Sequence, residues 1–199
     1  MEPLLKGIIA GITISLMIGP IFLALADITI SKGWRSGMAY IAGILITDFI
    51  FIYLVETIFN HLSFEDLKTP IALIGGAVLI LFGVITFISK VNLKSPDVTS
   101  VKTLIGAFLK GFTLNLFNPF VAIWWITMYT TIAINYPSRV DKGLFYGGIL
   151  AMVFLFDLVK MRFSYYLKQH LTAEKLQWLK KIVGVCLIGF GAFMLISSF

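Results

Sequence analysis

The chain has 199 residues, of which 59% are hydrophobic and 13% charged, and its mean hydropathy is +0.96. This composition excludes an ordinary soluble globular domain and indicates an integral membrane protein. The formal net charge of +6 therefore indicates basic loops that orient the chain in a bilayer, not a nucleic-acid-binding surface. The single cysteine, Cys186, excludes an internal disulfide and argues against a Cys-based zinc or thiol-redox site.

Six apolar segments follow in chain order, and each is long enough to cross about 30 Å of hydrocarbon as a helix. They cover residues 4–31, 37–59, 70–89, 103–134, 143–167 and 176–198. The connections are short, so we expect one all-α transmembrane domain over residues 1–199. The first segment is too long for the apolar core of a signal peptide, and we expect it to stay in the mature protein.

The two halves of the chain resemble each other. Residues 12–24 align with residues 111–123, and GIL occurs at both 43–45 and 148–150. IGGAVLILFG (74–83) aligns with IVGVCLIGFG (182–191), with six of ten positions identical. Because each half has an odd number of spans, the second copy is inverted relative to the first, as in many secondary transporters. We therefore predict inverted three-helix repeats over residues 1–92 and 102–199.

The first and fourth segments carry prolines at equivalent places, in Gly19-Pro20 and Asn118-Pro119. Proline removes a backbone hydrogen bond and pushes the residue before it away from helical geometry. A single proline often does no more than kink a membrane helix. A matched pair instead favours two broken helices around a binding site near the membrane midplane.

Charged residues inside the spans are costly and usually face a cavity, a partner or a proton. Asp48 lies in the second segment and Asp157 in the fifth, where Lys160 follows within reach on the same helix. Each aspartate is a candidate for proton or cation coupling, with a purely structural ion pair as the alternative. In a switchable pair, a substrate amine would displace Lys160.

Asn115 and Asn118 flank the second break, where their amides either cap the helix or hold a zwitterion. Trp124 and Trp125 follow and form either a cavity wall or a lipid-facing belt. Nearer the segment ends we expect three charged residues at a solvated interface: Asp27, Glu56 and Lys110. Two stripes of small residues at every fourth position predict close helix packing: Gly7, Gly11, Ser15 and Gly19, and Gly143, Gly147 and Ala151.

Basic residues are divided unevenly between the two ends of the predicted bundle. Nine lysines and arginines fall after the first, third and fifth segments, and four fall at the opposite end. Cytoplasmic loops of membrane proteins carry the excess of basic residues. We therefore expect the first set to be cytoplasmic and both termini to be extracytoplasmic.

Several short motifs, in this order and spacing, resemble the lysine exporter (LysE/RhtB) family of bacterial amino-acid exporters. They are IGP at 18–20, SKGWRSGMAYIAGILITD at 31–48, KGFTLNLFNPF at 110–120, DLVK at 157–160, the basic segment 168–181 and GFGAF at 189–193. Two positions depart from the family, which often has Pro-Gly-Pro at the first break and Asn-Pro-Lys at the second. Here the residues are Ile18-Gly19-Pro20 and Asn118-Pro119-Phe120.

The resemblance implies export of amino acids or related small metabolites across the bacterial inner membrane, driven by protons. It also suggests a homodimer. From the inverted repeats we expect alternating access, and from the apolar spans we expect contact with membrane lipid. By carry-over, the central site would contain the broken-helix residues and Asp48. With the carboxylates and amides above, the candidate substrate-binding or coupling residues are Gly19, Pro20, Asp48, Asn115, Asn118, Pro119, Asp157 and Lys160.

Three other classes of protein compete with this interpretation. A divalent-cation or other small-solute exporter of the same fold stays open, although a cation site needs clustered ligands. An enzyme is disfavoured because we find no acid/base pair or activated nucleophile, and His61 and His170 lie in or beside loops. A structural subunit does not account for paired helix breaks and intramembrane carboxylates. We therefore predict a transporter with no catalytic residues, no cofactor, no metal and no nucleic-acid partner.

Overall fold

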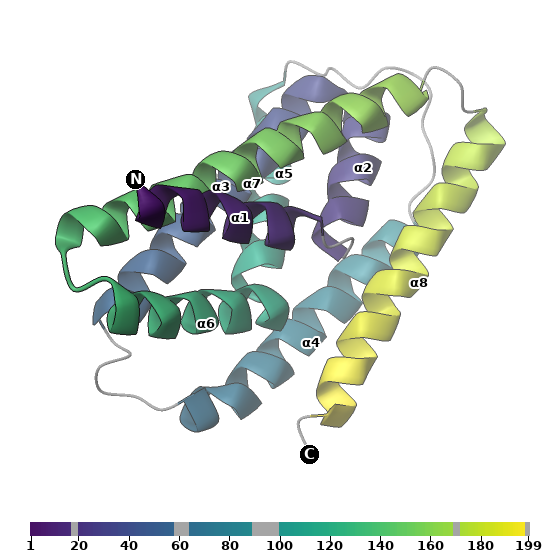
Figure 1. The fold of residues 1–199 in the computed structure, drawn as a ribbon. Coiled ribbons are helices and arrows are strands. Elements are labelled where there is room, and N and C mark those ends of the chain that lie inside the picture. The colour runs from purple at the N-terminus through teal and green to yellow at the C-terminus, as the bar shows by residue number, and fades with distance from the viewer. Residues whose placement is uncertain (17–19, 58–63, 89–99, 169–171, 198–199) are drawn as a thin grey trace.

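The structure, a computed structural model, describes residues 1–16, 20–57, 64–88, 100–168 and 172–197. All regular secondary structure in these ranges is helical and forms eight helices (Figure 1). Their bounds are α1 (Glu2–Ser15), α2 (Pro20–Lys32), α3 (Trp34–Thr57), α4 (Phe64–Ile88), α5 (Val101–Leu116), α6 (Pro119–Asn135), α7 (Arg139–Lys168) and α8 (Ala173–Ser197).

The first and fourth predicted segments each contain two helices. Helix α1 ends at Ser15 and α2 begins at Pro20, while α5 ends at Leu116 and α6 begins at Pro119. Helices α5 and α6 are bent by 59° at this junction. Proline suits the first position of a helix, because its missing N–H needs no partner there.

The other segment boundaries differ from the predicted ones by a few residues. The largest difference is in α4, which begins at Phe64 and not at residue 70. The apolar run used for the prediction ends at the charged residues within 64–69, but the helical backbone hydrogen bonds continue through them. Helix α2 passes to α3 through Gly33, whose φ of 86° is a conformation that glycine adopts readily.

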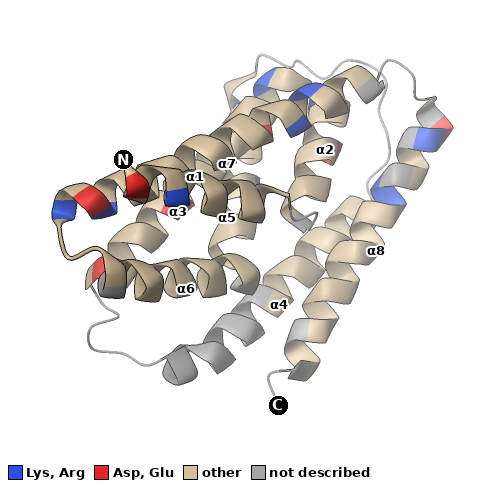
Figure 2. Cartoon of the chain, viewed as in Figure 1, with Lys and Arg blue, Asp and Glu red and all other residues tan. Residues whose placement is uncertain are grey.

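The described helices are those of a multi-pass membrane protein. Helices α3 and α7 are long and apolar enough to cross a membrane, and α5 with α6 meets the same test as one bent pair. Among the described residues, Gly76–Ile88 of α4 is a shorter apolar helix. Charged residues gather toward the two ends of the bundle, and most of the described length between them is uncharged (Figure 2).

The helices pack mainly as three pairs: α1 with α7, α3 with α5 and α4 with α8. Helix α2 is surrounded by α3, α5, α7 and α8. Helices α4 and α8 run side by side along one flank of the bundle (Figure 1). Buried apolar side chains form two clusters, one around Tyr40 and Leu114 and one around Trp125 and Ile149.

Glycines bring α4 and α8 to backbone contact at two points. A Cβ on Gly191 would lie 2.6 Å from the carbonyl oxygen of Gly76, and a Cβ on Gly184 would lie 2.8 Å from that of Gly83. No side chain fits at either crossing without moving a backbone. These two glycine pairs therefore fix how closely α4 and α8 approach.

The two predicted stripes of small residues behave differently. Gly7 of α1 contacts the backbone of Phe145 in α7, as predicted for the first stripe. In the second stripe, added Cβ atoms on Gly143 and Gly147 meet no described atom within 4 Å, so that prediction is wrong. Gly148 contacts α1 instead, because it lies about 100° further around α7 than Gly147.

We predict that Gly191→Ala destabilises the fold by about 1–3 kcal/mol, because its Cβ would press on the backbone of α4. Gly189→Ala is the matched control, since a Cβ there meets no described atom within 4 Å. The control should be neutral or stabilising by up to about 1 kcal/mol, because alanine is the better helix former. The fraction of monodisperse protein left after heating in detergent measures both, and equal curves would contradict the assignment of this crossing.

Candidate substrate-binding site

A cavity of about 420 Å³ lies beside the two helix junctions. This volume is within the roughly 300–1,000 Å³ typical of small-molecule sites. Its walls come from α1, α2, α3, α5, α6, α7 and α8. The polar residues on the wall are Ser15, Asp48, Asn115, Asn118, Thr127, Asp157 and Lys160.

Asp48 of α3 is 4% exposed and is held from two other helices. Its Oδ1 accepts hydrogen bonds from Asn115 Nδ2 of α5 at 2.9 Å and from Trp125 Nε1 of α6 at 3.1 Å. Asn115 Nδ2 also lies 2.8 Å from Thr47 Oγ1 and 3.2 Å from the carbonyl oxygen of Ile44. Both of these hydrogen bonds reach Oδ1, so among the described residues Oδ2 is left for a proton or a ligand.

Asp157 and Lys160 form the predicted pair on the cavity wall. Asp157 is 6% exposed, and its Oδ1 lies 3.2 Å from Lys160 Nζ. The ammonium also sits 5.9 Å from the ring centroid of Phe22, in the first turns of α2. A carboxylate and an ammonium one helical turn apart therefore face the same cavity that contains Asp48.

The two asparagines at the second break do different things. Asn118 caps α6: its Oδ1 accepts from the backbone N–H of Phe120 at 3.0 Å, and its carbonyl oxygen accepts from Val121 N at 3.1 Å. Asn115 instead reaches across to Asp48. Pro20 and Pro119 begin their helices, whereas Gly19 lies outside the described residues, as do His61 and His170.

Other cavity residues carry a weak signal or none in the sequence. Trp124 and Trp125 both line the cavity, and Trp125 is 1% exposed, so a lipid-facing belt is wrong for Trp125. Within the part of the chain that the structure describes, Ser15 Oγ and Trp124 Nε1 are buried without a hydrogen-bond partner. Sequence reasoning placed Ser15 only in a packing stripe, because nothing local marks it as cavity-lining.

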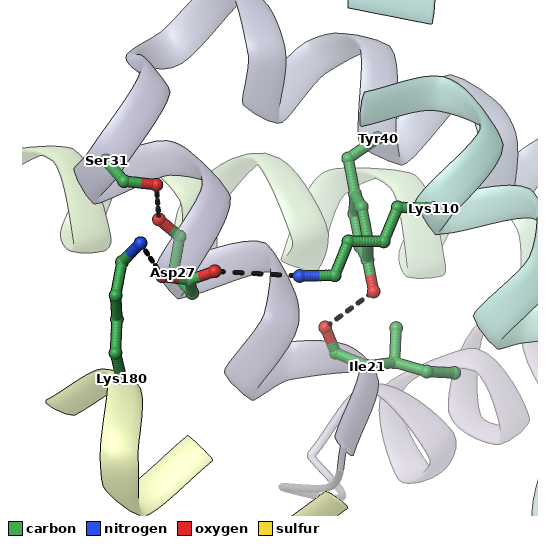
Figure 3. Close-up of polar contacts among 6 residues, drawn as sticks. All are labelled: Ile21, Asp27, Ser31, Tyr40, Lys110 and Lys180. Atoms are coloured by element: carbon green, nitrogen blue, oxygen red, sulfur yellow. Dashed lines mark hydrogen bonds and ion pairs between the residues drawn. The ribbon is translucent and has the colours of Figure 1, made fainter. Parts of the chain in front are cut away.

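A second polar cluster ties α2 to α5 and α8 (Figure 3). Asp27 Oδ2 lies 3.6 Å from Lys110 Nζ, and Asp27 Oδ1 lies 3.8 Å from Lys180 Nζ. Beside this cluster, the Tyr40 hydroxyl donates to the carbonyl oxygen of Ile21 at 3.0 Å. Asp27 is only 7% exposed, so the predicted solvated position is wrong for this residue.

At the other end of the bundle, Glu56 ties α3 to α7. Its Oε2 lies 2.7 Å from Lys142 Nζ, and its Oε1 accepts from the Tyr146 hydroxyl at 2.7 Å. The Glu56 and Lys142 side chains keep 27% and 23% of their surface exposed. This cluster is therefore more open to solvent than the one around Asp27.

Within the described ranges, no three His, Cys, Asp or Glu side chains gather as metal ligands. The cavity offers instead two carboxylates, one ammonium and an apolar wall, which suit a small organic molecule with charged ends. A ligand-sized cavity beside broken membrane helices is typical of transporters.

Comparison with known proteins assigns the family. The profile of the LysE type translocators matches residues 12–198, and the chain belongs to this family. It is also 26% identical to the "Putative amino acid efflux protein YcgF" of Bacillus subtilis (strain 168), over 96% of this chain and 94% of that protein. No solved structure matches the chain. The protein is therefore a membrane translocator and not an enzyme, and the family resemblance found in the sequence is confirmed.

We predict that Trp125→Phe destabilises the protein by about 1–3 kcal/mol, because it removes the indole donor to Asp48 while keeping an aromatic ring. Trp178→Phe is the control, since Trp178 is 61% exposed. Survival of monodisperse protein after heating compares the two variants. An equal loss in both would mean that the bond to Asp48 contributes nothing measurable.

We also predict that Asp27→Asn destabilises by about 3 kcal/mol, because it leaves two largely buried lysines without their carboxylate. The control is Glu2→Gln, which breaks an ion pair of 2.8 Å with Lys6 whose side chains are 55% and 71% exposed. A surface pair of this kind contributes little to stability, because water screens both charges. Denaturation in mixed micelles measures both variants, and an unchanged Asp27→Asn would show that the cluster is not a structural tie.

Proposed function

We propose that this translocator exports amino acids or closely related small metabolites across the inner membrane, coupled to protons, by alternating access between inverted repeats. The main observation behind this proposal is that Asp48, Asp157 and Lys160 line the same cavity. The similarity to an amino acid efflux protein favours the same substrate class here.

A zwitterion matches the charges of the cavity. The substrate ammonium would replace Lys160 Nζ at Asp157, and the substrate carboxylate would replace Asp157 at Lys160 Nζ. Asp157 and Lys160 each keep an oppositely charged partner in this exchange, so no charge is left unpaired in a site of low dielectric constant. The donors Ser15 Oγ and Trp124 Nε1 have no partner of their own among the described residues and would also serve a carboxylate.

Asp48 would carry the coupled proton. Its hydrogen-bond donors Asn115 and Trp125 hold Oδ1, while Oδ2, which accepts from no described residue, would take a proton from the cavity. Protonation would remove a buried charge and leave both donors in place. The carboxylate could therefore alternate between two charge states without rearranging α3, α5 and α6.

Helix pairing supports six spans in two inverted repeats. In the sequence alignment, α1 to α4 correspond to α5 to α8. If each helix is replaced by its counterpart in the other repeat, the α1–α7 pair becomes the α5–α3 pair. The α4–α8 pair becomes α8–α4, which is the same pair. The same exchange converts the Gly76–Gly191 crossing into the Gly184–Gly83 crossing. A two-fold relation within the membrane plane produces such matched contacts.

The cavity wall is unequal on the two broken helices, which favours a state open toward one side. Among the side chains that the structure describes, six of α6 line the cavity, from Phe120 to Thr127, and two of α2 do, Ile21 and Phe22. The Asp27 cluster holds α2 in place. If the basic end of the bundle is cytoplasmic, this arrangement is closed to the cytoplasm and extends outward along α6. Opening to the cytoplasm would break the Asp27 cluster.

The test is counterflow in proteoliposomes. Purified protein is reconstituted, loaded with each of a panel of unlabelled amino acids and offered the labelled form, with and without a pH gradient. We expect exchange of a subset of the panel, faster with the gradient. Asp48→Asn and Asp157→Asn should each lower exchange at least tenfold while the protein stays monodisperse.

Asp141→Asn is the control, because Asp141 lies in the first turn of α7 and outside the cavity wall. It should exchange like the wild type. Full activity in Asp48→Asn would remove Asp48 from the mechanism. If the folded wild type exchanged none of the amino acids in the panel, the proposal of amino-acid export would be overturned.

A further inference from the structure

Helix α6 contributes a broad apolar face to the cavity. Phe120, Val121, Ile123 and Trp124 all lie on the wall, and Phe190 of α8 lies beside them. The rings of Phe120 and Phe190 meet edge to face, with centroids 6.2 Å apart and an interplanar angle of 88°. Phe120 is 43% and Ile123 is 45% exposed, and both line the cavity.

The charged groups of the wall are already assigned. Asp157 and Lys160 would take the two charged ends of a zwitterion, and this step rests on the proposed function. Asp48 is held by Asn115 and Trp125. A third charge would have to lie against the apolar face of α6, or, if it is positive, occupy Asp48 Oδ2, the atom that takes the coupled proton in the proposed function. An unpaired charge in apolar surroundings is strongly disfavoured.

The size of the cavity also favours a substrate with a large apolar side chain. A glycine or alanine zwitterion would leave most of the cavity of about 420 Å³ unfilled. A large apolar side chain would cover Phe120 and Ile123 and remove their surface from water. Each additional methylene that contacts such a wall changes discrimination by a factor of about 10–200.

We infer that this transporter selects amino acids with a large apolar side chain, aromatic or branched aliphatic, and that Phe120 and Ile123 determine that selection. The side chain of the substrate lies along α6, while its ammonium and carboxylate lie at Asp157 and Lys160. Thr127, one turn beyond Ile123 along α6, is a polar residue of the cavity wall next to this face. It offers a hydroxyl but no counter-charge for a basic or acidic side chain.

The experiment is counterflow with leucine, phenylalanine, lysine, glutamate and glycine as separate substrates. For the wild type we expect leucine and phenylalanine to exchange at least about tenfold faster than the other three. Ile123→Asp places a carboxylate in the apolar face and should raise the ratio of lysine to leucine exchange about tenfold. Ile123→Asn is the matched control, and it should slow leucine exchange without raising that ratio.

Phe120→Asp is the second variant, with Phe120→Asn as its control, and replaces the first pair if Ile123→Asp is not monodisperse. Preference of the wild type for lysine, glutamate or glycine would overturn the inference and leave amino-acid export standing. So would an unchanged lysine-to-leucine ratio in an active aspartate variant. Failure of the folded wild type to exchange any amino acid would overturn the proposed function and this inference with it.

Discussion

The buried carboxylate of Asp48 is the constraint on which the rest of the site depends. A charged group at this depth costs several kcal/mol unless other groups compensate it. Compensation comes from Asn115 and Trp125, which lie on two other helices. Both donors must be held within about 3 Å of one oxygen, so α3, α5 and α6 cannot shift independently.

Glycine packing makes that geometry possible. A Cβ on Gly43 would meet the backbone of Phe108, and a Cβ on Gly111 would meet that of Tyr40, so α3 and α5 lie at backbone contact. This close approach brings Asn115, one turn beyond Gly111, to Asp48. Because Asn115 also stands just before the break, the carboxylate is tied directly to the end of α5. The protonation state of Asp48 is thereby linked to the position of the end of α5, which lines the cavity.

The sequence predicted local features of the site well and distant ones poorly. The Asp157–Lys160 pair followed from its spacing of three residues, and the helix starts at Pro20 and Pro119 followed from local backbone chemistry. In contrast, Asp48 and Asn115 are 67 residues apart in the chain, and no periodicity in one sequence reports such a pairing. Asp27 was misplaced because hydropathy locates a residue along a segment and not relative to neighbouring helices. Ser15 looked like a packing residue for the same reason.

The two polar clusters at opposite ends of the bundle differ in a way that fits a transport cycle. The cluster around Asp27 is largely buried, whereas Glu56 and Lys142 keep more of their surface in solvent. Breaking a buried ion pair costs more than breaking an exposed one, because the separated charges lose more compensation. In our account, protonation of Asp48 supplies the free energy that opens the α2 side, and a substrate that binds from that side drives the return. Proton and substrate must then move in opposite directions.

The most direct test of this account is substrate-driven proton movement. Proteoliposomes carry a pH-sensitive dye inside and are loaded with the amino acid that the wild type exchanges fastest, with no initial pH difference. Outward flow of the amino acid through the wild type should acidify the interior, and Asp48→Asn should abolish the acidification while its protein content matches the wild type. Equal acidification in the two proteins would contradict the role of Asp48 as the coupling carboxylate.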